Sequence, residues 1–143
     1  MVTIVQEERP FVANAKFHID ERRINLNSRS FQLLLLQRRC ASCWGSLIQE
    51  PDSGRQLTAS KHLSKIASHC AKTSDYISKD MPIAEAIFRL LLANRNKQMT
   101  VGEIYDGLSD RWVDRMNPGI PEPYGIYKIM VKDVFYGFAE NGG

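Results

Sequence analysis

The amino-acid sequence predicts a helix-rich α+β fold. Apolar residues recur every three or four positions in several segments, which is the spacing of helices with one buried face. A shorter stretch, residues 15–26, alternates apolar and polar side chains as β-strands do. Apolar residues make up 43% of the 143 residues, which is enough to build a core of ordinary size.

The stretch over residues 15–26 predicts a β-hairpin. Its alternating apolar residues are Phe17, Ile19, Ile24 and Leu26. Residues 20–22 lie between the two pairs and would form the turn. Ahead of this hairpin, Val2 and Ile4 alternate more weakly, which indicates either an edge strand or a loose tail.

Two helices are predicted next in the first half of the chain. Ser28 or Ser30 can cap the first, which covers about residues 31–39. A turn region rich in Gly, Pro, Asp and Ser follows over residues 45–56. The second helix spans residues 59–71, and its inward residues are Leu63, Ile66, Ala67 and Cys70.

The second half of the chain begins after a polar link over residues 72–80. Asp80 and Pro82 predict the start of a helix that ends before the polar stretch beginning at residue 94. Thr100 and Glu103 have the spacing of a capping box, in which each side chain accepts a hydrogen bond from the other residue's amide. The sequence therefore predicts a second helix directly after Thr100.

The end of the chain predicts one more helix and a strand. A loop with three prolines covers residues 117–123, a third helix follows over residues 124–132, and a short strand covers residues 134–139. We therefore divide the chain into a hairpin-and-helix half, residues 1–76, and a three-helix half, residues 77–143. A single core shared by both halves is the alternative.

The order of elements over residues 81–139 resembles the winged-helix type of helix-turn-helix domain. In both, a helix, a short turn, a capped helix, a loop, a third helix and a terminal strand follow one another. The segment from Met99 to Leu108 resembles the second helix of such domains, where a polar cap precedes a glutamate and an apolar pair. Because the third helix of the family commonly enters the major groove of DNA, the resemblance implies DNA contacts for Tyr124, Tyr127, Lys128 and Lys132. Residues 19–37 are also similar to the hairpin and first helix of the DNA-binding domains of bacterial response regulators.

Positive charge lies mainly outside the winged-helix-like segment. Residues 1–80 carry twelve Lys and Arg against eight Asp and Glu, whereas residues 81–143 carry seven against eight. Phosphate contacts supply much of the affinity for DNA, so the arginines of the first half are candidates for anion contact, with solubility as the alternative. These are Arg22, Arg23, Arg29, Arg38 and Arg39. Winged helices also serve as protein-interaction modules, so the expected partner is DNA or a protein.

Cys40 and Cys43 form a C-x2-C motif, which presents two thiolates to one point in space. Zinc takes four sulfur and nitrogen ligands in a tetrahedron. Cys70 and His69 are the best further ligands, although adjacent residues diverge by about 100° on a regular helix and would have to converge at a frayed end. His62 is eight residues from Cys70, about 12 Å along a helix axis, and cannot share an ion with it on a regular helix. We therefore predict a zinc site formed by Cys40, Cys43, His69 and Cys70.

Two other interpretations of the cysteines stay open. Cys40 and Cys43 can form a reversible disulfide, and Arg38 and Arg39 would favour the thiolate that a small thiol-redox enzyme needs. Thioredoxin-like pairs open a helix in a βαβ unit, however, whereas this pair follows a predicted helix. The other interpretation is that all three cysteines are buried apolar side chains without a ligand.

These observations favour a non-enzymatic binding or regulatory module with a structural zinc ion. The sequence contains no P-loop, no dinucleotide-binding motif and no histidine pair of hydrolytic metal centres. Its longest apolar runs have four residues, too few to span a bilayer. The first ten residues lack the pattern of a secretory signal, so we expect a cytoplasmic protein.

Overall fold

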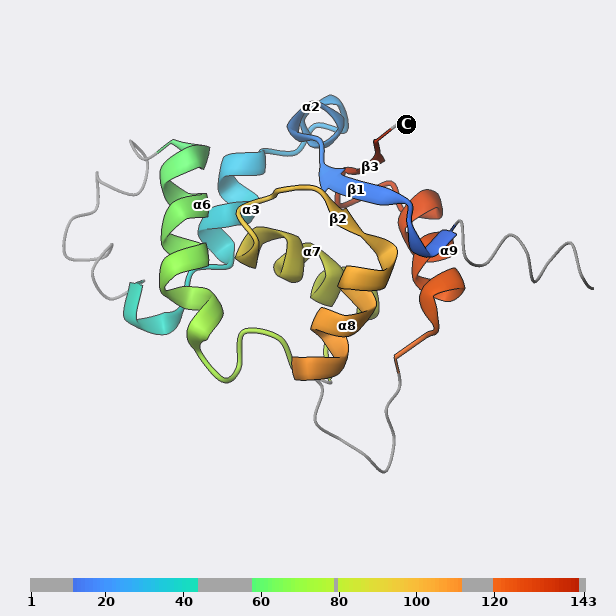
Figure 1. Ribbon diagram of the computed structural model, residues 1–143. Helices are drawn as coiled ribbons and strands as arrows, with labels where there is room; N and C mark the ends of the chain where they lie inside the picture. Colours follow the sequence, from blue (N-terminus) through green and yellow to red (C-terminus); the bar gives the residue numbers. More distant parts are fainter. Residues whose placement is uncertain (1–11, 44–57, 79, 112–119, 142–143) are drawn as a thin grey trace, which may run out of the picture.

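The computed structural model describes residues 12–43, 58–78, 80–111 and 120–141. They form helices and a small antiparallel sheet (Figure 1), which confirms the α+β, helix-rich fold class. The elements are β1 (Lys16–Ile19), α2 (Glu21–Leu26), α3 (Phe31–Gln37), α6 (Ala59–Ser68), a 3-10 turn (Cys70–Lys72), α7 (Ile83–Ala93), β2 (Met99–Thr100), α8 (Val101–Arg111), α9 (Pro123–Lys132) and β3 (Phe138–Glu140).

The sheet joins strands that are far apart in the sequence. Strand β1 lies in the middle and pairs antiparallel with β2 on one side and with β3 on the other. Phe17 of β1 lies opposite Met99 of β2 and also opposite Glu140 of β3. A strand from the first half of the chain is therefore hydrogen-bonded to two strands from the second half.

The prediction of a second strand in the hairpin is wrong, because residues 21–26 form helix α2. Asp20 caps this helix, and its carboxylate accepts a hydrogen bond from the backbone N–H of Arg22 at 3.0 Å. Ile24 is fully buried, whereas Leu26 is 83% exposed. A helix of less than two turns with one inward residue cannot display a helical period, so the spacing of its two apolar residues is also that of a strand. The strand–turn–strand implied by the resemblance to response regulators is not formed.

The remaining predicted helices are confirmed. Helices α3, α6, α7, α8 and α9 lie where the apolar spacing placed them. The capping box of α8 is complete, because the N–H of Glu103 donates to Oγ1 of Thr100 at 3.0 Å and the N–H of Thr100 donates to Oε1 of Glu103 at 2.8 Å. Helix α6 is shorter than predicted and ends at Ser68 rather than at residue 71.

The final strand begins later than predicted, at Phe138 rather than at residue 134. The carboxylate of Asp133 accepts hydrogen bonds from the N–H groups of Phe135 and Tyr136, each at 2.8 Å, and so forms a turn in place of a strand. Gly137 follows with a φ of 72°, and a Cβ there would lie 2.8 Å from Cγ1 of Ile24. Only glycine fits this backbone conformation so close to α2.

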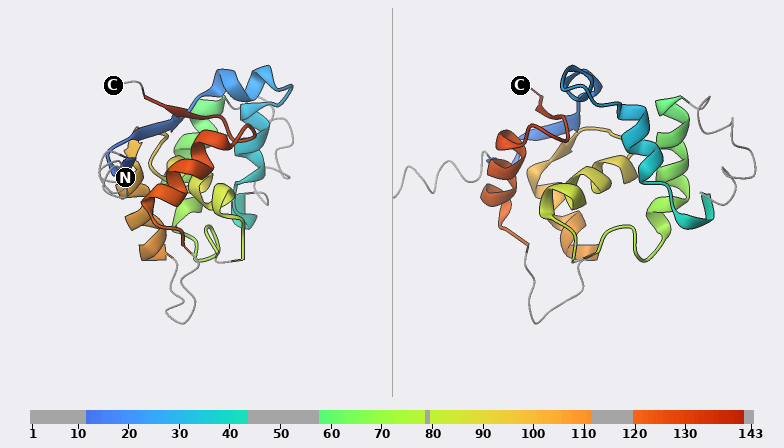
Figure 2. Two further views of the ribbon diagram at one scale, coloured as in Figure 1. Left: turned by 90° about the vertical axis from the view of Figure 1, so that its right-hand side faces the viewer. Right: turned by 180° about the vertical axis from the view of Figure 1, so that it is seen from behind.

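Helix α7 lies at the centre of the molecule. It packs against α6 and against α8, and Figure 2 shows it enclosed by the other helices. Its buried residues are Ala86, Ile87, Phe88, Leu90, Leu91 and Leu92. Because α6 and α3 also pack against each other, the core fixes the position of both helices that lead to the cysteines.

Some predictions lie outside the described residues. These are the strand at Val2 and Ile4, the turn region over residues 45–56 and the first part of the loop over residues 117–123, namely residues 117–119. Within the part of the chain that the structure describes, no helix is both long enough and apolar enough to cross a bilayer.

Candidate metal centre

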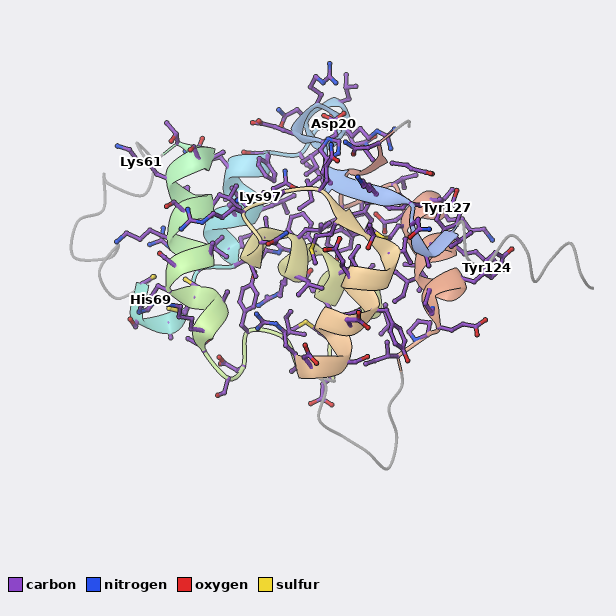
Figure 3. The ribbon with its side chains drawn as sticks, viewed as in Figure 1. Asp20, Lys61, His69, Lys97, Tyr124 and Tyr127 are labelled. Carbon is purple, nitrogen blue, oxygen red and sulfur yellow. The ribbon has the colours of Figure 1, made fainter. Side chains whose placement is uncertain are left out.

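Three cysteines and one histidine meet where α3 and α6 end. Helix α3 ends at Gln37, and residues 41–43 then form a further helical turn. Cys40 immediately precedes that turn, and Cys43 lies within it. Figure 1 shows this segment beside the last turn of α6, and Figure 3 shows His69 at the same place. The packing of α3 against α6 therefore brings Cys40 and Cys43 close to His69 and Cys70.

A break in the helix lets His69 and Cys70 point toward the same place. Helix α6 ends at Ser68, His69 has φ −131° and ψ −62°, and a 3-10 turn begins at Cys70. The turn is held in position by the Thr73 hydroxyl, which donates to the Cys70 carbonyl at 2.8 Å, and by Arg111, which donates to the Ala71 carbonyl at 3.1 Å. The end of the helix thus removes the divergence that a regular helix would impose.

The four donor atoms lie within 4.8 Å of one another. Sγ of Cys43 is 3.6 Å from Sγ of Cys70, and Nδ1 of His69 is 3.3 Å from Sγ of Cys40 and 3.7 Å from Sγ of Cys43. A tetrahedron with metal–sulfur bonds near 2.3 Å has sulfur–sulfur edges of roughly 3.8 Å and sulfur–nitrogen edges of roughly 3.6 Å. The spacing therefore suits one tetrahedral ion. It does not suit a disulfide, whose sulfur atoms are about 2.05 Å apart.

The sulfur atoms also accept hydrogen bonds from the backbone. The N–H of Cys40 donates to Sγ of Cys70 at 3.2 Å. Cys70 is fully buried and Cys43 is 9% exposed, whereas His69 lies at the surface. A buried thiolate needs such donors or a cation to offset the loss of its hydration. This group of cysteines has a backbone N–H donor, and the spacing of its donor atoms leaves room for a cation.

The pKa values of two thiols are shifted in opposite directions. Burial opposes ionisation of Cys40, but hydrogen bonds from the backbone N–H of Cys43 and from the side chains of Cys43, Cys70 and His69 outweigh it and lower its pKa to about 6. Burial, together with the neighbouring thiols of Cys43 and Cys40, raises the pKa of Cys70 to about 11. Without a cation, this group therefore accommodates one thiolate more readily than three. A bound metal ion would favour all three.

His62 lies apart from this group and has a different neighbour. It is fully buried, and its Nδ1 is 3.0 Å from Nη1 of Arg39, which is 8% exposed. This agrees with the prediction that His62 and Cys70 cannot share an ion. A zinc ion bound by three thiolates and a neutral imidazole has one net negative charge, and the guanidinium of Arg39 places a positive charge on the residue next to Cys40.

The arginines predicted to contact anions are held by other groups of the protein. Arg38 forms an ion pair with Glu85, and its side chain is 9% exposed. Arg23 donates to the carbonyl of Phe138 at 2.7 Å, and Arg29 donates to the carbonyl of Phe135 at 3.0 Å. Arg22 is exposed and lies 3.4 Å from the carboxylate of Asp20. Three of these four side chains thus join elements of the fold.

The residues implied by the winged-helix resemblance lie on α9. Lys128 lies over the ring of Tyr124 at 5.5 Å, and the hydroxyl of Tyr127 donates to Glu140 at 3.1 Å. Lys132 is exposed in the last turn. Acidic residues flank the helix at both ends, with Glu122 before it and Asp133 after it.

A group of exposed basic residues was missed at the level of the sequence. Lys61 and Lys65 lie on α6, and Arg95 and Lys97 lie in the turn after α7. The signal was present, because residues 58–72 contain three lysines and no acidic residue. The net charge of each half of the chain hides this segment, because acidic residues elsewhere in the same half offset its lysines.

Comparison of the chain with protein families, with characterised proteins and with solved structures finds no match.

Proposed function

We propose that this protein is a non-enzymatic binding module in which a structural zinc ion joins the end of α3 to the end of α6. One observation carries the proposal: the donor atoms of Cys40, Cys43, His69 and Cys70 lie within 4.8 Å of one another. We further propose that the C-terminal part is of winged-helix type and that the module contacts DNA or a protein partner.

The donor set favours zinc in a structural role. Thiolates and imidazole suit zinc, whereas carboxylates and carbonyls suit magnesium or calcium. Structural zinc sites have four protein ligands, and catalytic ones keep a position open for water or substrate. Four protein donors are present here, so a zinc ion bound by all of them has no free position.

The winged-helix proposal is supported by the order of elements. Helix α7, strand β2, helix α8, helix α9 and strand β3 follow one another as in that family. Strand β1 lies between β2 and β3. The sheet therefore contains a strand that the family resemblance did not include.

Metal analysis of the purified full chain tests the zinc proposal. We expect one zinc ion per chain in protein from cells grown without added zinc. Replacing His69 by Ala should weaken zinc binding by more than about 100-fold, because the loss of a direct ligand exceeds the 10–100-fold cost of losing an outer partner. Competition with a chromophoric chelator measures the affinity.

His18→Ala is the matched control for His69→Ala. His18 lies on β1, so the control also removes an imidazole but not from the metal centre. It should leave zinc affinity unchanged. A wild-type chain that binds no zinc, or equal losses in the two variants, would contradict the proposal.

A thiol-redox function is the second candidate, and one observation favours it. Cys40 has a lowered pKa and borders a cleft of about 150 Å³ together with Thr73, Tyr76 and Arg89. Thiol titration separates the two functions. Three thiols that react only after chelation indicate the zinc site, whereas two thiols of metal-free protein that cycle reversibly with a disulfide indicate the enzyme.

A further inference from the structure

We infer that the exposed side of α6, together with the turn after α7, binds the phosphate backbone of nucleic acid. We define the α6 basic face as Lys61, Lys65, Arg95 and Lys97. The inference rests on the proposed function, since it names nucleic acid as the partner of the binding module. It places that partner on a different surface from the helix that the winged-helix resemblance implies.

The two parts of the α6 basic face lie side by side. Nη1 of Arg95 lies 3.4 Å from the hydroxyl of Ser64, which brings the turn against α6. Lys61 and Lys65 are three residues before and one residue after Ser64, and they are separated by about 6 Å along the helix axis. Figure 3 labels Lys61 on α6 and Lys97 in the turn beside it.

The α6 basic face carries no acidic residue. The segment over residues 58–72 contains three lysines, and the segment over residues 94–98 contains Arg95 and Lys97. Neither segment contains Asp or Glu. Within the described residues, the ion pairs involve Arg22, Arg38 and Arg89 and none of these four cations. None of the four cations is therefore neutralised by an ion pair with another residue that the structure describes.

The turn that carries Arg95 is held in an unfavourable conformation. Arg95 and Asn96 have φ values of 59° and 58°, in a region that residues other than glycine adopt at a cost. The side chain of Asn96 holds the turn on the sheet, because Oδ1 accepts from the N–H of Ile19 at 2.7 Å and Nδ2 donates to the Ile19 carbonyl at 2.9 Å. Arg95 and Lys97 thus project from a fixed turn beside α6.

The chemistry of the face suits phosphate rather than base edges. Ser60, Ser64 and Ser68 recur every four residues on the exposed side of α6, next to the two lysines. Serine hydroxyls and lysine ammonium groups are common donors to phosphate oxygens, which position a protein on a duplex without reading its sequence. By contrast, α9 has acidic residues at both ends. We therefore assign backbone contact to α6 and not to α9.

Binding to duplex DNA at a series of salt concentrations tests the inference. Fluorescence anisotropy of a labelled random duplex of about 20 base pairs gives the affinity from about 50 to 200 mM salt. Four cationic contacts predict a slope of log affinity against log salt of about −3.6. The double variant Lys61→Gln, Lys65→Gln should reduce the magnitude of that slope by about 2.

Lys128→Gln combined with Lys132→Gln is the matched control. It removes the same charge from exposed positions on α9 and should leave the slope unchanged. The inference would be overturned by no duplex binding at low salt, by an unchanged slope in the α6 variant, or by an equal change in the α9 variant. Binding to phosphatidylserine vesicles but not to the duplex would also overturn it, in favour of a membrane surface.

Zinc content is measured on the same samples, so that the two proposals fail separately. A zinc-loaded chain that does not bind the duplex ends the inference about α6 and leaves the zinc proposal. A zinc-free chain that binds the duplex through Lys61 and Lys65 ends the zinc proposal and leaves the inference about α6. Both lysine double variants should retain the zinc content of the wild type, since none of the four lysines lies among the donors.

Discussion

At the scale of single residues, Glu85 joins three parts of the fold. Arg38 donates to both of its carboxylate oxygens at 2.8 and 3.0 Å, Arg89 donates at 2.8 Å, and the hydroxyl of Tyr136 donates at 2.8 Å. Burial would raise the pKa of Glu85, but the hydrogen bonds from Arg38 and Arg89 outweigh it and lower the pKa. The ionised form is therefore part of the folded state.

This shift predicts a contribution of Glu85 to acid stability. A carboxyl group with a lowered pKa in the folded state stabilises above its ordinary pKa of 4.5, and the contribution disappears as pH falls below that value. Glu85→Gln should destabilise the protein by about 3 kcal/mol at pH 7, because Arg38 is left buried without its charge partner. The difference between wild type and variant, from urea unfolding, should shrink below pH 4.5.

Glu21→Gln is the control for Glu85→Gln. Glu21 is exposed in the first turn of α2, so its loss removes the same charge with little effect on stability. Both variants are compared with the wild type in the same metal state, so that release of metal in acid affects all three chains. A difference for Glu85→Gln that stays constant from pH 7 to pH 3 would contradict the assignment.

At the scale of elements, the ends of helices decide where the site residues lie. Helix α6 stops at Ser68, and this stop lets the side chains of His69 and Cys70 both lie near those of Cys40 and Cys43. Helix α8 begins at a complete capping box whose threonine, Thr100, is also the last residue of β2, the strand that pairs with β1. The caps and breaks of helices thus help to position both a strand and the candidate metal ligands.

The capping box of α8 gives a prediction at this scale. Thr100→Ala removes the acceptor for the N–H of Glu103 and should lower the free energy of unfolding by about 1 kcal/mol. Thr100→Ser keeps a hydroxyl at the cap and should change it by a few tenths at most. Thermal or urea unfolding of the three chains measures this, and equal stability of the Ala and Ser variants would refute a role of the cap.

At the scale of the whole molecule, two kinds of interaction join segments that are distant in the sequence. The sheet joins β1 to β2 and β3, and the proposed zinc ion joins the end of α3 to the end of α6. The two interactions involve different elements, because the sheet contains only strands and the proposed ion lies between two helix ends. Loss of one should therefore loosen one part of the molecule before the other.

Removal of the metal tests this separation. With excess chelator, amide hydrogen exchange should become faster over residues 31–43 and 58–72, because binding energy is lost from the two segments that share the ion. Protection of β1, in the middle of the sheet, should be retained. Equal loss of protection in β1 and α6, or no change in either, would contradict the proposed role of the ion.

The sequence by itself predicted helices α3, α6, α7, α8 and α9, and it also predicted the four residues whose donor atoms lie close enough to hold a metal ion. Helical spacing and caps are local signals, since they depend on residues three or four positions apart. The separation of eight residues between His62 and Cys70 likewise places the two side chains too far apart on a regular helix to bind one ion. His69, next to Cys70, is therefore the better candidate for the fourth ligand.

Only the tertiary structure decided which segments meet. Strand β1 pairs with residues about 80 and 120 positions further along the chain, and no local pattern specifies such partners. Helix α2 was misread because one buried residue shows no period, and the predicted anion-binding arginines Arg23, Arg29 and Arg38 proved to hold other elements in place. The α6 basic face exists for the same reason: it combines two segments that are not adjacent in the sequence, with Ser64 and Arg95 31 residues apart, and the packing of α6 against α7 brings them together.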